Sequence, residues 1–345
     1  MRWLLGHPGP HFSVHDVYEG WIEGLRDCGE QVFTFNLGDR ITFYDAAMIE
    51  VEERDADGNM QARKAMPRGD AVQLAAEGLV NAAMKCWPHV ILAVSAFFYP
   101  TWMLDLFRSR GMKVVLLHTE CPYQDDEQLD RAAHSDINLL NDPVSLPRYA
   151  ELGPAAYMPH AYRPSVHYPA AAGTVADYDL AFVGTGFPSR VQFFDRMNLD
   201  GLKVKLAGPW EDPAQWADFD HDDCIDNTET AGIYRQSRAG INLYRREGEQ
   251  TWDGGAVAMG PREVEMAACG LFFLRDPRPE GDQVLDMLPR FTGPGDASDQ
   301  LRWWLAHDLQ RESAARKARE AIEGRTFASN ARALMRMIEK EHARG

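Results

Sequence analysis

A glycine-rich turn followed by an arginine is the first feature of the sequence that could bind a ligand. Gly184, Thr185 and Gly186 follow an apolar run, and Arg190 comes shortly after them, where a helical pattern begins. Backbone N–H groups at such a turn and at a helix start attract an anion, and an arginine can donate two parallel hydrogen bonds to a phosphate. The pattern predicts a phosphate site, with a tight turn that binds no ligand as the alternative.

The turn is not a complete dinucleotide-binding motif. Ser189 stands where G-x-G-x-x-G would have its third glycine, and the predicted strand 203–208 does not end in an acidic residue. In NAD enzymes that acidic residue holds the ribose. The sequence therefore disfavours hydride transfer from a nicotinamide cofactor.

Arg262 and Glu265 form a second cluster, on a predicted helix that begins near Pro261 and ends at Gly270. Proline suits the first helical turn and glycine suits the C-terminal cap. Residues three apart lie on one face of a helix. Spacing alone leaves two alternatives open: a surface ion pair, or a pair in a cleft where the arginine meets phosphate and the glutamate accepts two ribose hydroxyls.

Three residues of the N-terminal half are candidates for acid–base catalysis. His118 and Glu120 come at the end of a predicted strand, where α/β proteins bind ligands, and His11 precedes the first helix. A carboxylate can orient an imidazole so that it takes a hydroxyl proton. The alternative is that each histidine is a loop or capping residue. Phe97 and Phe98 follow the strand before it, where they could stack on a sugar ring or pack in the core.

Short apolar runs alternate with helix-period segments, which is typical of βαβ units and a parallel sheet. The first half predicts helices from Ser13 and over 102–109, an irregular stretch over 37–69 and a hairpin at Asp57-Gly58. The fold class is α/β. The predicted strands are 3–5, 31–35, 89–94, 113–118 and 136–140 in the first half, and 178–184, 202–208, 239–243 and 270–274 in the second.

A Pro/Ala/Gly stretch without periodicity, residues 163–177, separates these two runs of α/β pattern. We therefore expect one domain over residues 1–165 and a second over 176–325. The charged amphipathic tail, 302–344, predicts a pair of helices with a solvated face, and we expect the last helix to span 326–345.

Composition narrows the functional classes. The 345 residues contain 36 Lys and Arg against 52 Asp and Glu, a net charge of −16, which disfavours duplex nucleic acid as a partner. The five cysteines include no CxxC pair, which indicates a reducing compartment, with the cytoplasm expected. The longest uncharged apolar stretch, 90–104, is too short to span a membrane.

Together these segments resemble the CgeB-like (spore maturation type) branch of the glycosyltransferases. The resemblance implies the GT-B fold, with two facing Rossmann-like domains and a tail helix that packs back on the N-terminal one. It also implies an enzyme that moves a sugar from a nucleoside-diphosphate sugar to a hydroxyl acceptor. The resemblance rests on 178–184 with Arg190, on 239–243, 262–270 and 325–327, and on 118–123.

The resemblance also implies roles for individual residues. Glu265 would bind the ribose of the donor, for which UDP is the commonest nucleotide, and Arg190 and Arg262 would neutralise its diphosphate without a metal. Many retaining relatives carry Glu-x7-Glu, but Val257 stands at the first position here, which puts retention in question. The complete predicted donor site is Gly184, Thr185, Gly186, Arg190, Asn242, Asp253, Arg262 and Glu265.

Two other functions remain compatible with the sequence. A nucleotide-sugar epimerase would use the same fold, because fold does not fix chemistry. A non-catalytic protein of a spore or surface assembly would keep the fold without the reaction. The acidic stretch 218–223 contains a D-x-D pattern, which we interpret as a solvated loop and not as a metal site.

Overall fold

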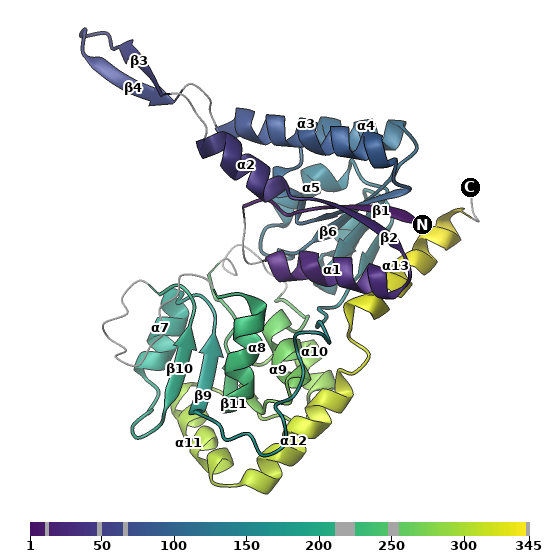
Figure 1. Cartoon of the computed structure of the whole chain (residues 1–345). Coiled ribbons are helices and arrows are strands. Elements are labelled where there is room, and N and C mark those ends of the chain that lie inside the picture. The colour runs from purple at the N-terminus through teal and green to yellow at the C-terminus, as the bar shows by residue number, and fades with distance from the viewer. Residues whose placement is uncertain (11–13, 47–49, 65–67, 211–224, 248–254, 343–345) are drawn as a thin grey trace. The chain divides into compact units, whose positions relative to one another are not determined.

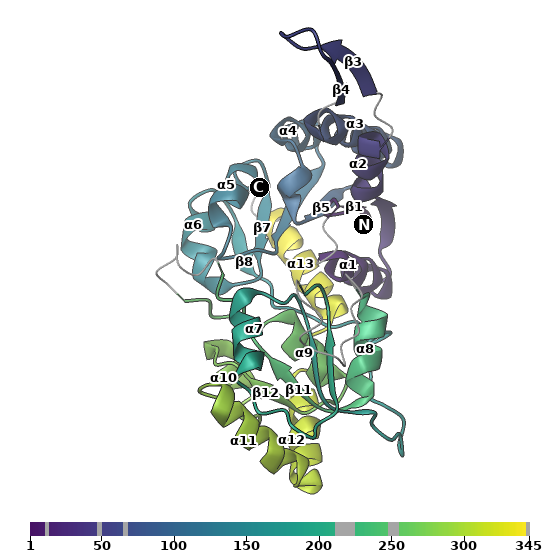
Figure 2. The same cartoon turned by 90° about the vertical axis from the view of Figure 1, so that its left-hand side faces the viewer.

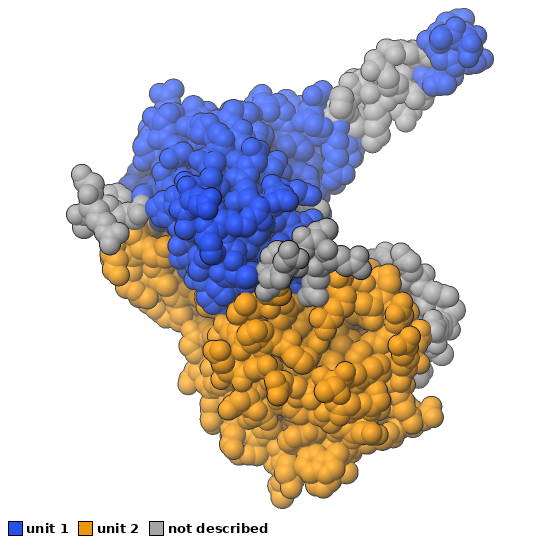
Figure 3. All heavy atoms as spheres, turned by 180° about the vertical axis from the view of Figure 1, so that it is seen from behind, with its two compact units in different colours: residues 1–158 blue, residues 159–345 orange. Residues whose placement is uncertain are grey.

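The computed structural model describes residues 1–10, 14–46, 50–64, 68–210, 225–247 and 255–342, drawn as coloured ribbons in Figures 1 and 2. The chain forms two compact units, residues 1–158 and 159–345, which Figure 3 distinguishes by colour. The units thus divide at Met158–Pro159, whereas the sequence placed a linker over 163–177. We describe each unit by itself.

Unit 1 is built on a six-stranded parallel sheet with the strand order β2-β1-β5-β6-β7-β8. Each residue of β5 is buried, as an unbroken run of Val, Ile, Leu and Ala in a central parallel strand should be. The α/β prediction is confirmed for this half. The strands are β1 (Arg2–Gly6), β2 (Gln31–Phe35), β5 (Val90–Val94), β6 (Lys113–His118), β7 (Ile137–Leu140) and β8 (Ala155–Tyr157).

Helices lie on both faces of this sheet (Figure 1). The first helix, α1, begins after Val14 without a side-chain cap and buries Tyr18, Trp21 and Leu25; the predicted cap, Ser13, lies outside the described residues. The helical elements of unit 1 are, in chain order, α1 (His15–Asp27), α2 (Leu37–Ala46), α3 (Arg68–Cys86), η2 (Ala96–Phe98), α4 (Thr101–Ser109), α5 (Asp125–Ala132), η3 (Pro143–Ser145) and α6 (Leu146–Ala150).

The segment that the sequence predicted to be irregular contains real structure. Helix α2 buries Leu37 and Ile41 in the same core cluster as Ala75 and Leu79 of α3, so tertiary packing fixes a segment whose own pattern is weak. The hairpin prediction is confirmed: β3 (Glu50–Arg54) and β4 (Met60–Lys64) pair antiparallel. Strand 136–140 was predicted to be the last of this half, which is wrong because β8 pairs beside it.

Unit 2 has a four-stranded parallel sheet with the order β10-β9-β11-β12. Helix α7 lies over one face of the sheet and α8 over the other (Figure 2). Helix α9 approaches β11 closely at Gly240, where an added Cβ would lie 2.6 Å from Met266 Sδ. The elements are β9 (Tyr178–Val183), α7 (Pro188–Asp195), β10 (Val204–Ala207), α8 (Asn227–Arg235), β11 (Ser237–Asn242), α9 (Pro261–Ala268), β12 (Phe273–Arg275) and α10 (Pro279–Val284).

The rest of unit 2 is helical, as the charged tail predicted. Helix α12 contributes Ala314, Ala315 and Ala318 to the core of unit 2. The expectation that the tail packs back on the N-terminal half stays a prediction. In the described part of the chain, no helix is both long and apolar enough to cross a membrane. The last helices are α11 (Pro294–Leu305), α12 (Asp308–Ala321) and α13 (Phe327–His342).

Candidate functional site

Helix α9 carries the second predicted cluster, and local sequence fixes both of its ends. At the start, the Glu263 carboxylate accepts the Gly260 N–H at 2.9 Å, and Pro261 occupies the first turn. At the end, Gly270 adopts φ 71° and donates to Ala267 O, while the Leu271 N–H donates to Met266 O, both at 3.0 Å. The predicted helix bounds are confirmed, so Arg262 and Glu265 share one face.

Arg262, Glu265 and Asn227 form one polar cluster between α8 and α9. Arg262 Nη1 donates to Glu265 Oε2 at 2.6 Å and to Asn227 Oδ1 at 2.7 Å, and Asn227 Nδ2 donates to Glu265 Oε1 at 3.2 Å. Glu265 is 4% exposed. The alternative of a surface ion pair therefore does not describe Glu265, whose carboxylate is buried.

The Glu265 carboxylate is ionised in spite of its burial. Burial would raise its pKa, but the charges of Arg262 and His167 and the hydrogen bonds from Arg262 and Asn227 hold the pKa below its usual range. A buried, charged carboxylate with oriented partners is a strong acceptor for hydroxyl groups. This is the type of group that the ribose of a nucleotide would need.

Arg190 connects the glycine turn to the end of β11. Its Nη1 donates to Thr185 O at 3.0 Å, and its Nε and Nη2 donate to Leu243 O at 3.1 and 2.7 Å. Burial lowers the pKa of Arg190 to about 10. Backbone carbonyls thus accept the hydrogen bonds of the Arg190 guanidinium. These bonds hold the glycine turn in place and keep a positive charge next to it.

The start of α7 already holds a carboxylate. Ser189 donates to Glu247 from its backbone N–H at 3.0 Å and from its hydroxyl at 3.1 Å. Burial would raise the pKa of Glu247, but the Ser189 N–H and other hydrogen bonds hold it below its usual range. The helix start that the sequence predicted to attract an anion is therefore occupied by an anion of this chain.

Gly184 and Gly186 bind the segment at the end of β10. Their N–H groups donate to Ala207 O and Pro209 O, both at 2.8 Å, so these two groups are already used and do not face a phosphate. Asn242, another predicted donor-site residue, is 6% exposed, and its Nδ2 has no hydrogen-bond partner among the described residues. Asp253 lies outside the described residues, as does the acidic stretch 218–223. The predicted roles of these residues stay predictions.

A cavity of about 470 Å³ opens beside the start of α7, at the carboxyl ends of β11 and β12. Arg190 and Arg246 both line it, and Arg246 Nη2 donates to the two Asp276 oxygens at 2.8 and 2.9 Å. Burial raises the pKa of Asp276. Ligands of open α/β sheets bind at this end of the strands.

Sequence reasoning missed Glu263, which neighbours the cluster. Glu263 is fully buried, accepts a hydrogen bond from the Tyr244 hydroxyl, and has no partner for Oε1 in the described part of the chain. Burial raises its pKa to about 7. Its place three residues after Gly260 matches a helix-capping glutamate, which is the signal that could have revealed it.

In unit 1, the structure describes two of the three candidates for acid–base catalysis and places them in different surroundings. His118 is 1% exposed, shares a hydrogen bond of 2.8 Å with Asn138 Oδ1 and lies against the Tyr149 ring. Burial lowers the pKa of His118 to about 4, so the ring is neutral near pH 7. Glu120, in contrast, lines a cavity. His11 lies outside the described residues, and the catalytic roles of all three stay predictions.

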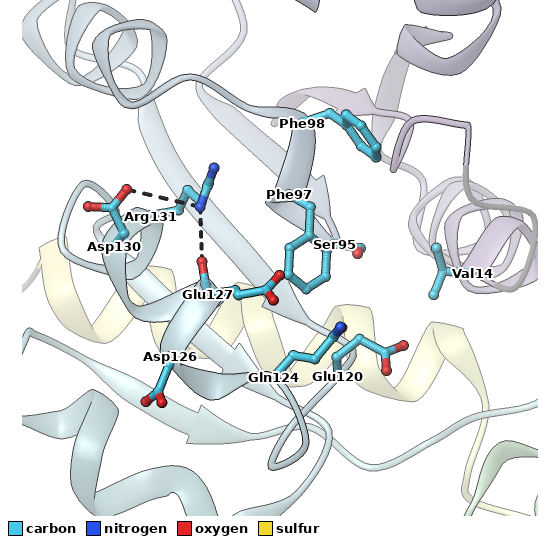
Figure 4. A pocket seen from close by; sticks show the side chains of 10 residues that line it. All are labelled: Val14, Ser95, Phe97, Phe98, Glu120, Gln124, Asp126, Glu127, Asp130 and Arg131. Carbon is cyan, nitrogen blue, oxygen red and sulfur yellow. Dashed lines mark hydrogen bonds and ion pairs between the residues drawn. The ribbon is translucent and has the colours of Figure 1, made fainter. Parts of the chain in front are cut away.

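This second cavity, of about 530 Å³, lies at the carboxyl ends of β5 and β6 (Figure 4). Its walls combine carboxylates with the half-buried rings of Phe97 and Phe98. Ser95 follows β5 directly and has φ 55°, which is uncommon for a residue with a side chain. Such backbone strain persists where the surroundings hold it in place.

Part of the chain matches a known protein family. Residues 190–336 match the family model described as glycosyl transferase-like, a segment that begins at Arg190 and contains Arg262 and Glu265. No curated protein matches the chain.

Solved structures match along the whole chain. Sucrose-phosphate synthase from Thermosynechococcus elongatus has a TM-score of 0.66 at 14% identity, with 100% of each chain covered. An alpha-glucosyltransferase in complex with UDP has a TM-score of 0.66 at 12% identity, with 98% of each chain covered. A trehalose-6-phosphate protein from E. coli, bound with UDP-2-fluoro glucose, has a TM-score of 0.60 at 11% identity, covering 97% of this chain and 98% of that one.

The chain has the GT-B fold, an α/β architecture with parallel sheets and a helical C-terminal portion. The family match and the fold together support an enzyme of the glycosyltransferase type. The CgeB-like branch within that type stays a prediction.

Proposed function

We propose that this protein transfers a sugar from a nucleoside-diphosphate sugar, a UDP-sugar in the first place, to a hydroxyl group of an acceptor, with the nucleoside diphosphate as the leaving group and without a metal ion. The single observation that carries the proposal is the buried Glu265 carboxylate held by Arg262 and Asn227, inside a segment that matches a glycosyl transferase-like family. The UDP ligands named for two structural neighbours favour uridine.

In this proposal, Glu265 accepts the ribose hydroxyls. The hydrogen bonds from Arg262 and Asn227 fall on different carboxylate oxygens, and each oxygen has a second lone pair for a hydroxyl. Because Arg262 and Asn227 already orient the carboxylate, binding costs little side-chain ordering.

The diphosphate binds at the start of α7, beside the glycine turn. There it displaces the Glu247 carboxylate from the Ser189 N–H and hydroxyl, exchanging one anion for another. Arg190 keeps the turn in place, and its positive charge together with that of Arg262 stabilises the leaving diphosphate. Fixed positive groups of this kind do the work that a metal ion does elsewhere.

A thermal-shift panel of UDP, GDP, ADP, dTDP and CDP, with and without Mg²⁺, tests the donor site. A nucleotide at 100 times its dissociation constant stabilises the folded protein by about 2.7 kcal/mol. We expect a shift with UDP that does not depend on Mg²⁺ and that Glu265→Gln removes. Glu229→Gln changes the same charge on the exposed surface of α8 and should leave the shift intact.

If Glu265→Gln does not fold, Asn227→Ala is the second variant, since it removes one partner of the carboxylate and keeps the charges. No shift with any nucleotide would refute the proposal and favour a non-catalytic role. Conversion of a UDP-sugar into its epimer without acceptor would identify the epimerase alternative instead.

A further inference from the structure

The cavity of unit 1 is built from separate elements that meet at one end of the sheet. Ser95 follows β5, Phe97 and Phe98 belong to the short helix η2, and Glu120 follows β6. Helix α5 supplies most of the rest of the wall, and Val14 before α1 completes it. Figure 4 shows the Phe97 ring and the carboxylates of Glu120 and Glu127 around the same space. The position matches the usual ligand site of a parallel sheet.

The charges on its walls do not balance. Glu120, Asp126, Glu127 and Asp130 line the cavity together with one basic residue, Arg131. Asp126 also accepts a hydrogen bond from Arg148 Nη2, outside the lining, at 2.5 Å. Arg131 Nη1 lies 4.0 Å from the Asp130 carboxylate and donates to the Glu127 backbone carbonyl at 2.9 Å. The Glu127 carboxylate itself has no hydrogen bond or ion pair within the described residues. The cavity therefore carries an excess of hydrogen-bond acceptors and of negative charge.

A serine side chain in the wall also has no hydrogen-bond partner among the described residues. Ser95 is 2% exposed, lines the cavity, and makes no side-chain hydrogen bond to any described residue. Figure 4 shows its oxygen in the wall, in the view between Phe97 and Val14. A buried hydroxyl without a partner costs free energy unless a ligand or water completes it.

From this wall we infer that the acceptor is a polyhydroxylated molecule that carries a protonated amine and no phosphate, such as an amino sugar or an aminocyclitol. The inference rests on the proposed function, because it names the acceptor of that reaction. Hydroxyl and ammonium groups supply donors for the Glu127 carboxylate and for Ser95, and the Phe97 ring offers a face to a sugar ring or an ammonium group. A phosphorylated sugar would meet like charges.

Three probes that share one ring test the charge preference: glucosamine, glucose and glucose 6-phosphate. Their binding to the full chain is measured without any donor, by ligand-observed saturation-transfer NMR at low and high salt. We expect glucosamine to bind more tightly than glucose, and glucose 6-phosphate more weakly than both. High salt should reduce the preference, since it screens exposed charges.

Glu127→Gln is the decisive variant, because it keeps the shape of the side chain and removes one wall charge. It should lower the preference for glucosamine over glucose about two- to fivefold, the size expected for one partly exposed charge pair. Glu77→Gln on α3, exposed and outside the cavity, is the matched control and should change nothing. Ser95→Ala should weaken glucosamine and glucose alike.

Equal binding of the three probes, a preference for glucose 6-phosphate, or no binding of any probe would overturn the inference. So would a preference for glucosamine that Glu127→Gln and Glu77→Gln change equally. Because these measurements contain no nucleotide, they are independent of the UDP test. A UDP shift without probe binding would refute the acceptor class and keep the proposed function. Probe binding without a UDP shift would refute the proposed function and keep the ligand class of this cavity.

Discussion

The candidate donor site of unit 2 and the cavity of unit 1 differ in how their charges are compensated. In unit 2, Arg262 and Glu265 bind each other, Arg246 binds Asp276, and Arg190 is held by backbone carbonyls. In unit 1, the Glu127 carboxylate has no partner among the described residues. The first site is organised before any ligand arrives, whereas the second has an unbalanced charge that only a ligand or solvent can offset. We expect a rigid donor site and a more adaptable acceptor site.

The sharpest test of this difference is the stability cost of removing one carboxylate from each of these two sites. Glu265→Ala leaves Arg262 and Asn227 without their buried partner, so we expect the free energy of unfolding to fall by about 3 kcal/mol, the lower end for a broken buried pair because Arg262 is partly exposed. Glu127→Ala should change it by less than about 0.5 kcal/mol. Urea unfolding of both variants measures the two values, and similar costs would contradict the comparison.

Buried titratable groups give the units opposite pH dependence. Burial raises the pKa of Glu263 in unit 2 from 4.5 to about 7. Between these values the folded state holds a proton that the unfolded state has lost, so this group contributes less stability as the pH rises. The full effect is about 3 kcal/mol. Urea midpoints are measured for wild type and Glu263→Gln at pH 5 and pH 8. From pH 5 to pH 8, the stability of wild type should fall relative to that of Glu263→Gln.

If the stability difference between wild type and Glu263→Gln is independent of pH, Glu263 titrates normally and the raised pKa is refuted. Tyr244→Phe provides a control for the hydrogen bond alone, because it removes the hydroxyl that contacts Glu263 and leaves the carboxyl group buried.

His118 in unit 1 should behave in the opposite way. Burial lowers its pKa from 6.5 to about 4. Between these pH values, the ring is protonated in the unfolded state and neutral in the folded state. Its contribution is present above pH 6.5 and is lost by up to about 3 kcal/mol as the pH falls toward 4. His118→Gln should therefore lose less stability than wild type between pH 7 and pH 4. NMR titration of the His118 ring checks this directly, and a pKa near 6.5 would refute the enclosed ring.

The two sites also differ in how far the sequence could predict them. The Arg262–Glu265 pair lies within one helix, so spacing alone placed both residues on one face, and the cap residues Pro261 and Gly270 marked the helix ends. The cavity of unit 1 draws its wall from elements far apart in the chain, and no local pattern reports such a convergence. His118 shows the same limit: its strand was predicted correctly, but Asn138 and Tyr149, which enclose it, come from other elements.

The fold was predictable to a similar degree and for similar reasons. The central strands have continuous apolar runs and were located from the sequence, as β5 and β6 show. Helix α2 was missed because its residues Ile41, Thr42, Phe43 and Tyr44 favour strands, and only packing against α3 makes them helical. The short edge strand β8 contains three half-buried residues, too few for a pattern to detect.

The smallest expected effect concerns Glu247, the carboxylate that occupies the start of α7. Glu247→Gln weakens the hydrogen bonds from the Ser189 N–H and hydroxyl, so stability should fall by no more than about 1 kcal/mol, the size of a capping interaction. Because the variant also removes an anion that competes with the diphosphate, UDP should bind about two- to fivefold more tightly. Isothermal titration of UDP, with Glu229→Gln as the control, measures this. Weaker binding would instead mean that Glu247 stays in place and helps to position the donor, so that the diphosphate lies away from the start of α7.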